Sequence, residues 1–288
     1  MSALHLTDHR QGFPWWYTKV LDAHDDDGVG MEFGILRVPP DSAEERYERD
    51  NETHLVLLSG SGTVSIGAEN PLSCRVSRGD LFREKPWAFH LPKFTRFAIT
   101  TNGNDAHGIE FAVVKTAHDK PFDLAVQTPE QIPSELRGKG LAQGAMEREV
   151  RAIFGDPNAP YKPKASNIVI GEVVNFPGKW SSYPPHYHPQ PEVYYYRFDK
   201  PQGFGFSQAG GDGHPAQVRT HDVVKITNCV GHAQVAAPGY AMWYLWFLRQ
   251  LPRKRYKGNP PFTYFPEHVW ANDPKNQPRI FTPEKSPI

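Results

Sequence analysis

Hydrophobic residues recur in short runs along the chain, and residues with strong turn preference separate these runs. In the first part of the chain, the runs predict β-strands at 33–38, 54–58, 63–66, 75–82, 94–101 and 109–114. After residue 166 the pattern returns, with predicted strands at 168–176, 180–188, 193–198, 203–208, 217–226, 233–236 and 241–248. No long segment has the 3.6-residue period of an amphipathic helix, which argues against a Rossmann or TIM-type chain. The pattern therefore predicts an all-β protein with two β-sandwich or barrel domains.

The stretch between the two groups of strands is polar and rich in proline. We therefore divide the chain into an N-terminal β domain at 1–120, a connector at 121–165 and a C-terminal β domain at 166–288. In the connector, Thr128-Pro129-Glu130-Gln131 has the residue types of a helix start and predicts a short helix. Ser59-Gly60-Ser61-Gly62 predicts a hairpin loop between two strands. The tail after Arg249 is expected to wrap over the C-terminal domain.

Composition narrows the possible partners. The 288 residues include 32 Lys and Arg and 32 Asp and Glu, so the formal net charge is zero. Nucleic-acid-binding proteins normally carry a basic excess and disordered chains a large net charge, so neither description fits. No apolar run approaches the roughly 20 residues that span a bilayer. We expect a soluble globular protein that acts on a small molecule and binds neither nucleic acid nor membrane.

The turn-forming residues and the cysteines indicate the type of fold and the cellular location. The 28 prolines and 24 glycines suit many short strands joined by tight turns. The first residues lack the pattern of a secretory signal, and the two cysteines, Cys74 and Cys229, are too far apart in sequence to suggest a small disulfide framework. We therefore expect a cytoplasmic protein.

The clearest group of candidate metal ligands lies in the segment 183–192, Tyr-Pro-Pro-His-Tyr-His-Pro-Gln-Pro-Glu. In a strand, side chains two residues apart share a face, so His186 and His188 can present their imidazoles to one point. Pro189 and Pro191 cannot both lie inside a paired strand, so the chain should turn there and bring Glu192 back beside the two histidines. The segment therefore predicts three ligands of one metal ion.

A fourth ligand must come from another part of the chain, and His232 is the best candidate. Cys229 could compete as a thiolate ligand, although a small buried hydrophobe is its more common role. Neutral imidazoles with one carboxylate suit Zn, Fe, Mn, Ni or Co better than Mg or Ca. The alternative interpretation is a surface turn with two histidines beside prolines and a solvated Glu192.

The order His-x-His, Glu and a later Gly-His resembles the metal motifs of cupins. The surrounding residues are more specific: segments 178–188, 192–198, 201–206, 222–224 and 237–240 resemble the 5-deoxyglucuronate isomerase family of inositol breakdown. The related uronate ketol-isomerases of pectin breakdown are similar but more distant. The resemblance also reaches residues 137–140, Arg148 and Arg151 in the connector and 55–60 in the first domain, so it covers most of the chain.

The resemblance implies a bicupin whose second barrel holds a divalent metal, Zn first and Mn or Fe as alternatives. Carried over by position, the ligands are His186, His188, Glu192 and His232. The first barrel is expected to lack ligands, because it offers Glu52, His54 and His90 but no His-x-His. The implied activity is aldose–ketose isomerisation of a deoxy-uronic acid, 5-deoxy-D-glucuronate first, by an intramolecular oxidoreductase that forms a homo-oligomer.

Several further residues are candidates for the substrate pocket. Tyr194 and Tyr196 share the strand parity of Glu192, so they should face the interior and either could orient or protonate the sugar; a tyrosine-rich core is the alternative. Arg197 has the opposite parity and would need a bulge to reach a substrate carboxylate. Lys179, Gln208 and Arg249 are other candidates for that contact.

Two other functions remain open at this point. A cupin dioxygenase would hold Fe(II) with the same three histidines and one glutamate and would consume oxygen. A non-catalytic sugar-binding or storage bicupin would keep the barrels without requiring the ligand set.

Overall fold

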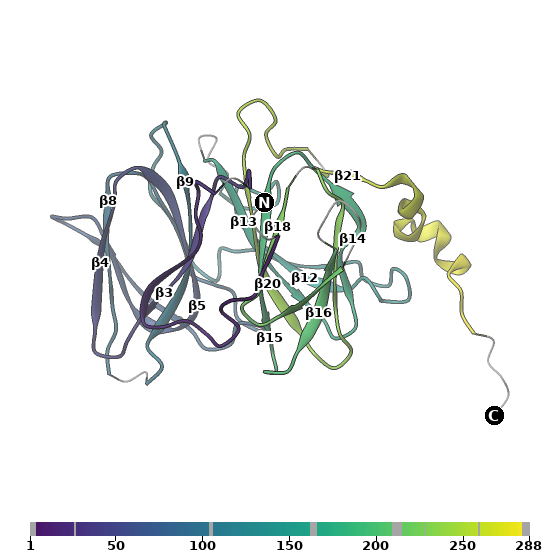
Figure 1. Ribbon diagram of the computed structural model, residues 1–288, viewed down its shortest axis with the longest axis horizontal. Coiled ribbons are helices and arrows are strands. Elements are labelled where there is room, and N and C mark those ends of the chain that lie inside the picture. Colours follow the sequence, from purple (N-terminus) through teal and green to yellow (C-terminus); the bar gives the residue numbers. More distant parts are fainter. Residues whose placement is uncertain are drawn as a thin grey trace.

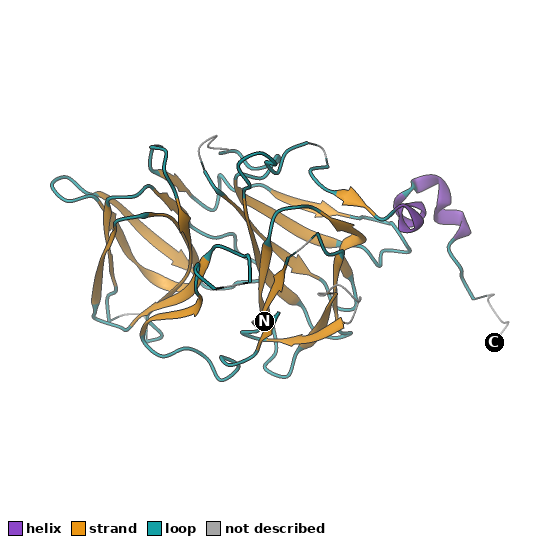
Figure 2. Cartoon of the chain, turned by 45° about the horizontal axis from the view of Figure 1, so that its top comes forward, coloured by secondary structure: helices purple, strands orange, loops and turns teal. Residues whose placement is uncertain are grey.

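Two β-rich halves lie side by side in space, as the hydrophobic pattern predicts (Figure 1). The computed structural model describes residues 4–25, 27–103, 106–161, 166–208, 215–227, 229–258 and 260–283. Strands dominate both halves, and the helical turns lie in the C-terminal extension (Figure 2). The fold is all-β, which confirms the predicted class, and the two-halved arrangement is consistent with a bicupin.

The N-terminal half is built on a nine-stranded sheet with the path β10-β7-β5-β9-β3-β2, to which β6, β8 and β4 attach through the second part of β5. Its strands are β2 (Trp16–Leu21), β3 (Glu32–Val38), β4 (Ala43–Glu48), β5 (Asn51–Ile66), β6 (Leu72–Arg78), β7 (Ala88–Leu91), β8 (Thr95–Thr100), β9 (Ile109–Ala117) and β10 (Ala125–Gln127).

The C-terminal half contains a seven-stranded sheet, β1-β18-β15-β20-β13-β12-β11, and a five-stranded sheet, β17-β16-β19-β14-β21. The strands of the first sheet are β1 (His5–Leu6), β11 (Ser134–Arg137), β12 (Arg148–Phe154), β13 (Ile168–Asn175), β15 (Glu192–Phe198), β18 (Val223–Ile226) and β20 (Met242–Arg249). Those of the second are β14 (Trp180–Tyr187), β16 (Phe204–Gln208), β17 (Pro215–Arg219), β19 (His232–Ala236) and β21 (Thr263–Tyr264).

Three hydrophobic cores follow from the alternation of side chains along the central strands. In β15, Tyr194 and Tyr196 face the core inside the C-terminal half, whereas Val193 and Tyr195 face a core shared by the two halves. β5 alternates similarly: Leu55 faces the core inside the N-terminal half, and Val56 faces the shared core. Because the two halves pack sheet against sheet, both faces of these strands are buried and read as nearly continuous apolar runs.

The segment Ser59-Gly60-Ser61-Gly62 is a bend within β5 and not the predicted hairpin loop. The first part of β5 pairs with β7 and β9, and the second part pairs with β6 and β8. Gly60 has a φ of 92°, and a Cβ there would lie 2.0 Å from the carbonyl oxygen of Gly108. The glycine therefore lets one strand turn the corner between two sheet regions at a point of close backbone approach.

The connector predicted at 121–165 is distributed between the two sheets. β10 joins the edge of the N-terminal sheet, and β11 and β12 extend the C-terminal sheet beyond β13. The predicted helix at Thr128 is only a turn. The backbone N–H of Thr128 donates to Oε1 of Gln131, and the backbone N–H of Gln131 donates to the carbonyl oxygen of Thr128, but β11 begins at Ser134. Pro133 follows this turn directly and disfavours helical backbone in the residue before it.

The predicted strand at 217–226 is two strands in different sheets. β17 ends at Arg219 and β18 begins at Val223, with a turn between them. The Asp222 carboxylate accepts a hydrogen bond from the backbone N–H of Arg219, and His221 has a φ of 73°. A side-chain acceptor of this kind closes a turn that apolar periodicity does not reveal.

Buried ion pairs join the two halves. Glu172 in β13 accepts hydrogen bonds from Arg78 in β6 and from Arg151 in β12, and all three side chains are fully buried. Arg197 in β15 pairs with Glu110 in β9. These contacts connect residues far apart in sequence and set how the two sheets face each other.

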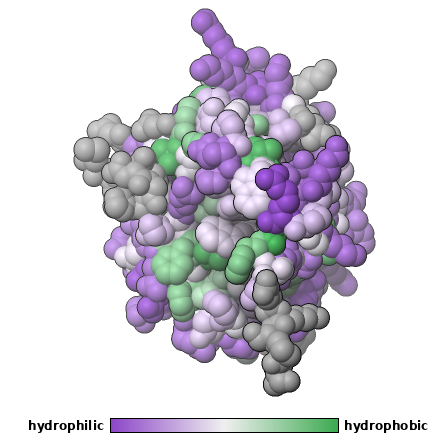
Figure 3. All heavy atoms as spheres, turned by 90° about the vertical axis from the view of Figure 1, so that its right-hand side faces the viewer, coloured by the Kyte–Doolittle hydropathy of each residue, from purple (hydrophilic) through white to green (hydrophobic). Residues whose placement is uncertain are grey.

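The C-terminal extension leaves the C-terminal half through β21 and two short 3₁₀ helices, η1 (Pro266–Asn272) and η2 (Pro274–Arg279). β21 of the tail therefore pairs with the C-terminal half, but η1 and η2 project outward and do not wrap over it as expected (Figure 1). The face that carries the extension shows apolar side chains gathered among polar ones (Figure 3). Homo-oligomeric assembly stays a prediction.

The described residues contain no helix that is long and apolar enough to cross a membrane.

Candidate metal centre

The four predicted ligands lie at the ends of three neighbouring strands. His186 is near the end of β14, and His188 follows that strand in the turn to β15. Glu192 is the first residue of β15 and His232 the first of β19, where it is the register partner of His186. The chain therefore delivers all four side chains to one buried place, since none is more than 8% exposed.

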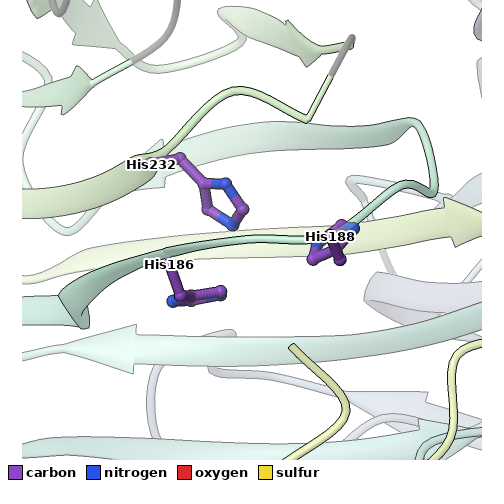
Figure 4. Close-up of side chains that lie close together, drawn as sticks. All are labelled: His186, His188 and His232. Carbon is purple, nitrogen blue, oxygen red and sulfur yellow. The ribbon is translucent and has the colours of Figure 1, made fainter. Parts of the chain in front are cut away.

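The histidine side chains are directed into a common space (Figure 4). One ring nitrogen from each of His186, His188 and His232 can be chosen so that all three lie within 4.8 Å of one another. The rings of His188 and His232 are nearly perpendicular, at 80°, and those of His186 and His232 are inclined at 63°. Inclined rings allow lone pairs from different directions to meet at one ion.

Glu192 completes the donor set. Its Oε2 atom lies 3.0 Å from Nε2 of His188 and 3.3 Å from Nε2 of His232. Burial alone would raise the pKa of Glu192, but the neighbouring His188 and His232 side chains lower it below its ordinary value. The carboxylate is therefore ionised, as a metal ligand must be.

Backbone carbonyls orient the three imidazoles. Nδ1 of His186 lies 3.4 Å from the carbonyl oxygen of Pro184, Nδ1 of His188 lies 3.0 Å from that of Gln190, and Nδ1 of His232 lies 3.1 Å from that of Val230. A carbonyl beside Nδ1 accepts a hydrogen bond from the Nδ1–H group. The ring proton then stays on Nδ1, and Nε2 can donate its lone pair to a metal ion. Nε2 of His232 is buried and makes no hydrogen bond in the described structure, so it fits a position beside an ion.

Burial favours the neutral form of His186. It lowers the pKa of His186 well below its ordinary value, and the neighbouring His232 and His188 lower it further. Three imidazoles and one carboxylate are a donor set that suits a divalent transition metal, so the residues present fit the expected group.

A pocket opens beside these ligands. His186, Glu192 and Tyr194 form part of its wall, and the remaining wall includes two arginines, further aromatic side chains and one aspartate. Phe262, from the tail, lies with its ring centroid 4.0 Å from that of His186. The tail therefore closes one side of the pocket.

Comparison with known proteins identifies the family of this chain. The model of the KduI/IolB family matches residues 8–270. The chain belongs to this family.

Curated relatives of this KduI/IolB protein are named as isomerases. The 5-deoxy-glucuronate isomerase of Geobacillus kaustophilus is 27% identical over 261 residues, which cover 86% of this chain and 87% of that protein. The enzyme of the same name from Bacillus subtilis strain 168 is 27% identical over 255 residues, 83% of this chain and 87% of that protein. These relatives confirm the prediction of an isomerase enzyme.

Solved structures share the fold. An IolB-like protein from Salmonella typhimurium superimposes with a TM-score of 0.76 at 22% identity and covers 94% of this chain and 100% of that one. A variant of Bacillus subtilis oxalate decarboxylase has a TM-score of 0.59 at 15% identity, covering 86% and 78% respectively.

The two tyrosines predicted at the site occupy different positions. Tyr194 lines the pocket and packs against His232, with the ring centroids 5.9 Å apart. Tyr196 lies deeper, where its hydroxyl donates to Oε1 of Gln234 at 2.7 Å. Of the two, Tyr194 is the one placed to meet a substrate.

The residues suggested for the substrate carboxylate lie away from this pocket. Arg197 donates from Nε to the hydroxyl of Tyr195 at 2.7 Å and pairs with Glu110, on the face toward the N-terminal half. Arg249 donates to the carbonyl oxygen of Val29 at 2.9 Å, in a hollow between the halves. Lys179 and Gln208 do not line the pocket either: Lys179 directly precedes β14, and Gln208 ends β16.

The sequence patterns did not identify several other residues that line the pocket. Arg137, Arg148 and Tyr244 come from strands whose place in the sheet depends on pairing, and Tyr256 and Phe262 come from the tail. The resemblance of the connector to the family included both arginines, and that was the only sequence signal for them.

A second group of potential ligands, Glu52, His54 and His90, also lies within 4.8 Å. It sits between the two halves, on the face of β5 opposite to the core of the N-terminal half. Glu52 Oε1 lies 3.3 Å from Nε2 of His54 and 3.0 Å from Nε2 of His90, and the backbone N–H of Asn167 donates to Oε2 at 2.7 Å.

The second group differs from the first in how its rings are held. The rings of His54 and His90 are stacked, with centroids 4.1 Å apart and planes inclined by 11°, and Nε2 of both rings points to Oε1 of Glu52. Their Nδ1 atoms make no hydrogen bond in the described structure, so Nε2 carries the proton that bonds Glu52. These contacts describe a hydrogen-bonded carboxylate, and the absence of a metal from the N-terminal half stays a prediction.

A buried ion pair lies inside the N-terminal half. Thr53 in β5 pairs with β7 and β9. Opposite Thr53, the ammonium of Lys115 lies 2.8 Å from a carboxylate oxygen of Glu48.

We predict that changing His54 or His90 to Gln leaves the metal content unaltered. The glutamine amide keeps an N–H donor for Glu52, so activity should stay within about threefold of the unmodified protein. Metal analysis of each purified variant, with circular dichroism as a check of folding, tests this. Loss of one equivalent of metal in either variant would show that the N-terminal half holds an ion.

Proposed function

We propose that this protein is a metal-dependent aldose–ketose isomerase that converts 5-deoxy-D-glucuronate to 5-dehydro-2-deoxy-D-gluconate. The observation that carries the proposal is the donor set of His186, His188, Glu192 and His232. Two of these residues, His186 and Glu192, line a pocket that also contains tyrosines. Family membership and the relatives named 5-deoxy-glucuronate isomerase support the choice of substrate.

The reaction is a proton exchange with no net oxidation. The hydrogen on C2 of the open-chain aldose leaves as a proton and a proton reaches C1, while the hydroxyl proton of O2 is lost and O1 gains one. A divalent metal at the four ligands, Zn first and Mn or Fe as alternatives, would supply a Lewis acid that polarises the carbonyl and stabilises the developing oxyanion charge.

Neutral phenols complete the pocket. Burial raises the pKa of Tyr194 well above its ordinary value, and the negative charge of Glu192 adds to this effect. Burial also raises the pKa of Tyr244 to about 12. Both hydroxyls therefore keep their protons at neutral pH, and Tyr194 is suited to donate a hydrogen bond to a substrate oxygen and to orient the sugar.

Water is restricted at the reacting end of the pocket. Phe262 covers His186, and Tyr256 packs against His188 with ring centroids 5.4 Å apart. An apolar cover strengthens electrostatic interactions beneath it, because fewer water dipoles screen them.

The proposal predicts deuterium incorporation during turnover. The metal-loaded protein is incubated with 5-deoxy-D-glucuronate in D₂O under nitrogen, and the products are followed by proton NMR together with metal analysis. A base that exchanges with solvent should place deuterium at the carbon that receives the proton, and activity should not need oxygen.

Other outcomes lead to different conclusions. Turnover without deuterium would point to a hydride shift or a shielded base. No turnover of any uronate, with ferrous iron bound and oxygen consumed on an aromatic substrate, would replace the proposal by a dioxygenase. Binding of sugars without metal or turnover would favour a storage or binding protein. A role in inositol breakdown and a cytoplasmic location stay predictions.

A further inference from the structure

Two arginines face each other at the wall of the metal pocket. Arg137 in β11 and Arg148 in β12 are direct register partners, and both line the pocket that contains His186 and Glu192. Like charges directly opposite on neighbouring strands repel each other, and such a pair lowers stability unless an anion lies between or above it.

Arg148 has no acidic partner in the described part of the chain. Its one hydrogen bond runs from Nη1 to the carbonyl oxygen of Met146 at 2.8 Å, and no carboxylate oxygen lies within 4.0 Å of its nitrogen atoms. Arg137 donates from Nε to Oε2 of Glu135 at 2.7 Å, at the exposed edge of the sheet. Burial lowers the pKa of Arg148, and the charge of Arg137 lowers it further.

Arg78 and Arg151, which are fully buried in the described structure, share Glu172, and Arg197 pairs with Glu110. A guanidinium that is removed from water without a carboxylate is costly, and it persists where a ligand supplies the missing charge. Arg148 therefore differs from these arginines in what surrounds it, and the open side of its surroundings is the pocket.

The backbone holds the Arg148 guanidinium in place. Gly138 follows Arg137 with a φ of 74°, and a Cβ at this position would lie 2.7 Å from Nη1 of Arg148 and 2.2 Å from the carbonyl oxygen of Met146. Only glycine allows this approach without displacing the guanidinium or the Met146 carbonyl.

We propose that Arg148, assisted by Arg137, binds the carboxylate of the uronic acid while the carbonyl end of the sugar lies at the metal ligands. The inference rests on the proposed function, because it names the substrate group that the pocket recognises at its second end. The planar guanidinium matches a carboxylate with two parallel hydrogen bonds, which a lysine ammonium cannot reproduce. The pair would therefore select uronic acids over neutral sugars.

The test compares two substrates in Arg148→Met and Arg148→Lys. One substrate is 5-deoxy-D-glucuronate, and the other is its neutral analogue with a hydroxymethyl group in place of the carboxylate. In Arg148→Met, kcat/KM for the uronate should fall by roughly 10- to 150-fold, mainly through KM, because hydrogen bonds between charged groups are lost. The value for the neutral analogue should stay unchanged, and Arg148→Lys should lie between the two.

Controls separate this role from a structural one. Metal content and circular dichroism should match the unmodified protein in each variant. Arg83→Met, which removes an arginine whose side chain is 87% exposed, should change neither substrate. A fall of equal size for both substrates, or an unchanged ratio between them, would overturn the assignment; Arg137→Met provides the same readout if the Arg148 variants do not fold.

Binding distinguishes failure of this inference from failure of the proposed function. If the unmodified protein turns over no uronate, calorimetry with D-glucuronate and D-glucose on the metal-loaded protein takes the place of kinetics. Tighter binding of D-glucuronate that disappears in Arg148→Met would keep the carboxylate site and discard the isomerase proposal. Equal binding of D-glucuronate by both proteins would overturn the carboxylate site.

Discussion

Replacing both His186 and His188 with alanine should abolish stoichiometric metal binding and reduce kcat/KM by roughly three orders of magnitude or more, because a Lewis acid contributes several kcal/mol to the stabilisation of a developing charge. The chain should still fold. The two histidines lie at the end of β14, and the apolar core of the C-terminal half is built from other side chains.

Metal analysis, circular dichroism and turnover of 5-deoxy-D-glucuronate test this expectation together. A double variant of His24→Ala and His107→Ala is the matched control, since it removes two exposed histidines outside the pocket. The control should keep its metal and its activity. Full metal occupancy in the His186/His188 variant would refute the assigned ligands.

A second large effect is expected at Glu172, on stability instead of on chemistry. Glu172→Gln removes the negative charge that the fully buried Arg78 and Arg151 share. Arg151 keeps its ion pair with Glu149, but the buried charge of Arg78 is left uncompensated, which should lower the free energy of unfolding by about 3–5 kcal/mol. The loss of stability should affect both halves, because Arg78 belongs to the N-terminal half and Glu172 to the C-terminal half.

Urea denaturation of the metal-loaded proteins measures this change. The control is Glu45→Gln, which breaks a surface pair with Arg96 whose side chains are 66% and 54% exposed. An exposed pair of this kind contributes at most about 1 kcal/mol. A similar small change in Glu172→Gln would show that the two arginines find other partners and that the buried pair does not hold the halves together.

Much of the candidate metal centre could be predicted from local sequence. The two-residue spacing of His186 and His188 places them on one face of a strand, and the prolines after them require the turn that returns Glu192. The carbonyls that orient the rings could not be predicted in the same way. Val230 and Gln190 reach the imidazoles through turns whose backbone conformation no side-chain pattern specifies.

Strand parity was informative for the tyrosines but not for the arginines. It separates Tyr194 and Tyr196 from Arg197 correctly, but it does not tell what lies on the other face of β15. That face meets the N-terminal half, where Glu110, 87 positions away in sequence, pairs with Arg197. In the sequence, Arg148 lies in the polar connector. Only the pairing of β11 with β12 and of β12 with β13 brings it to the pocket.

The sequence by itself determined the β class, the two-part organisation and the residues that can hold a metal, because alternation, turn residues and ligand spacing act over a few positions. The tertiary structure decided the bend at Gly60, the wall that the tail builds beside His186 and the ion-pair partners of Arg78, Arg151 and Arg197. These features depend on contacts between distant segments. A charged side chain in a strand becomes a structural ion pair or a free binding group according to which other strand packs against it, and that choice is made only when the sheets assemble.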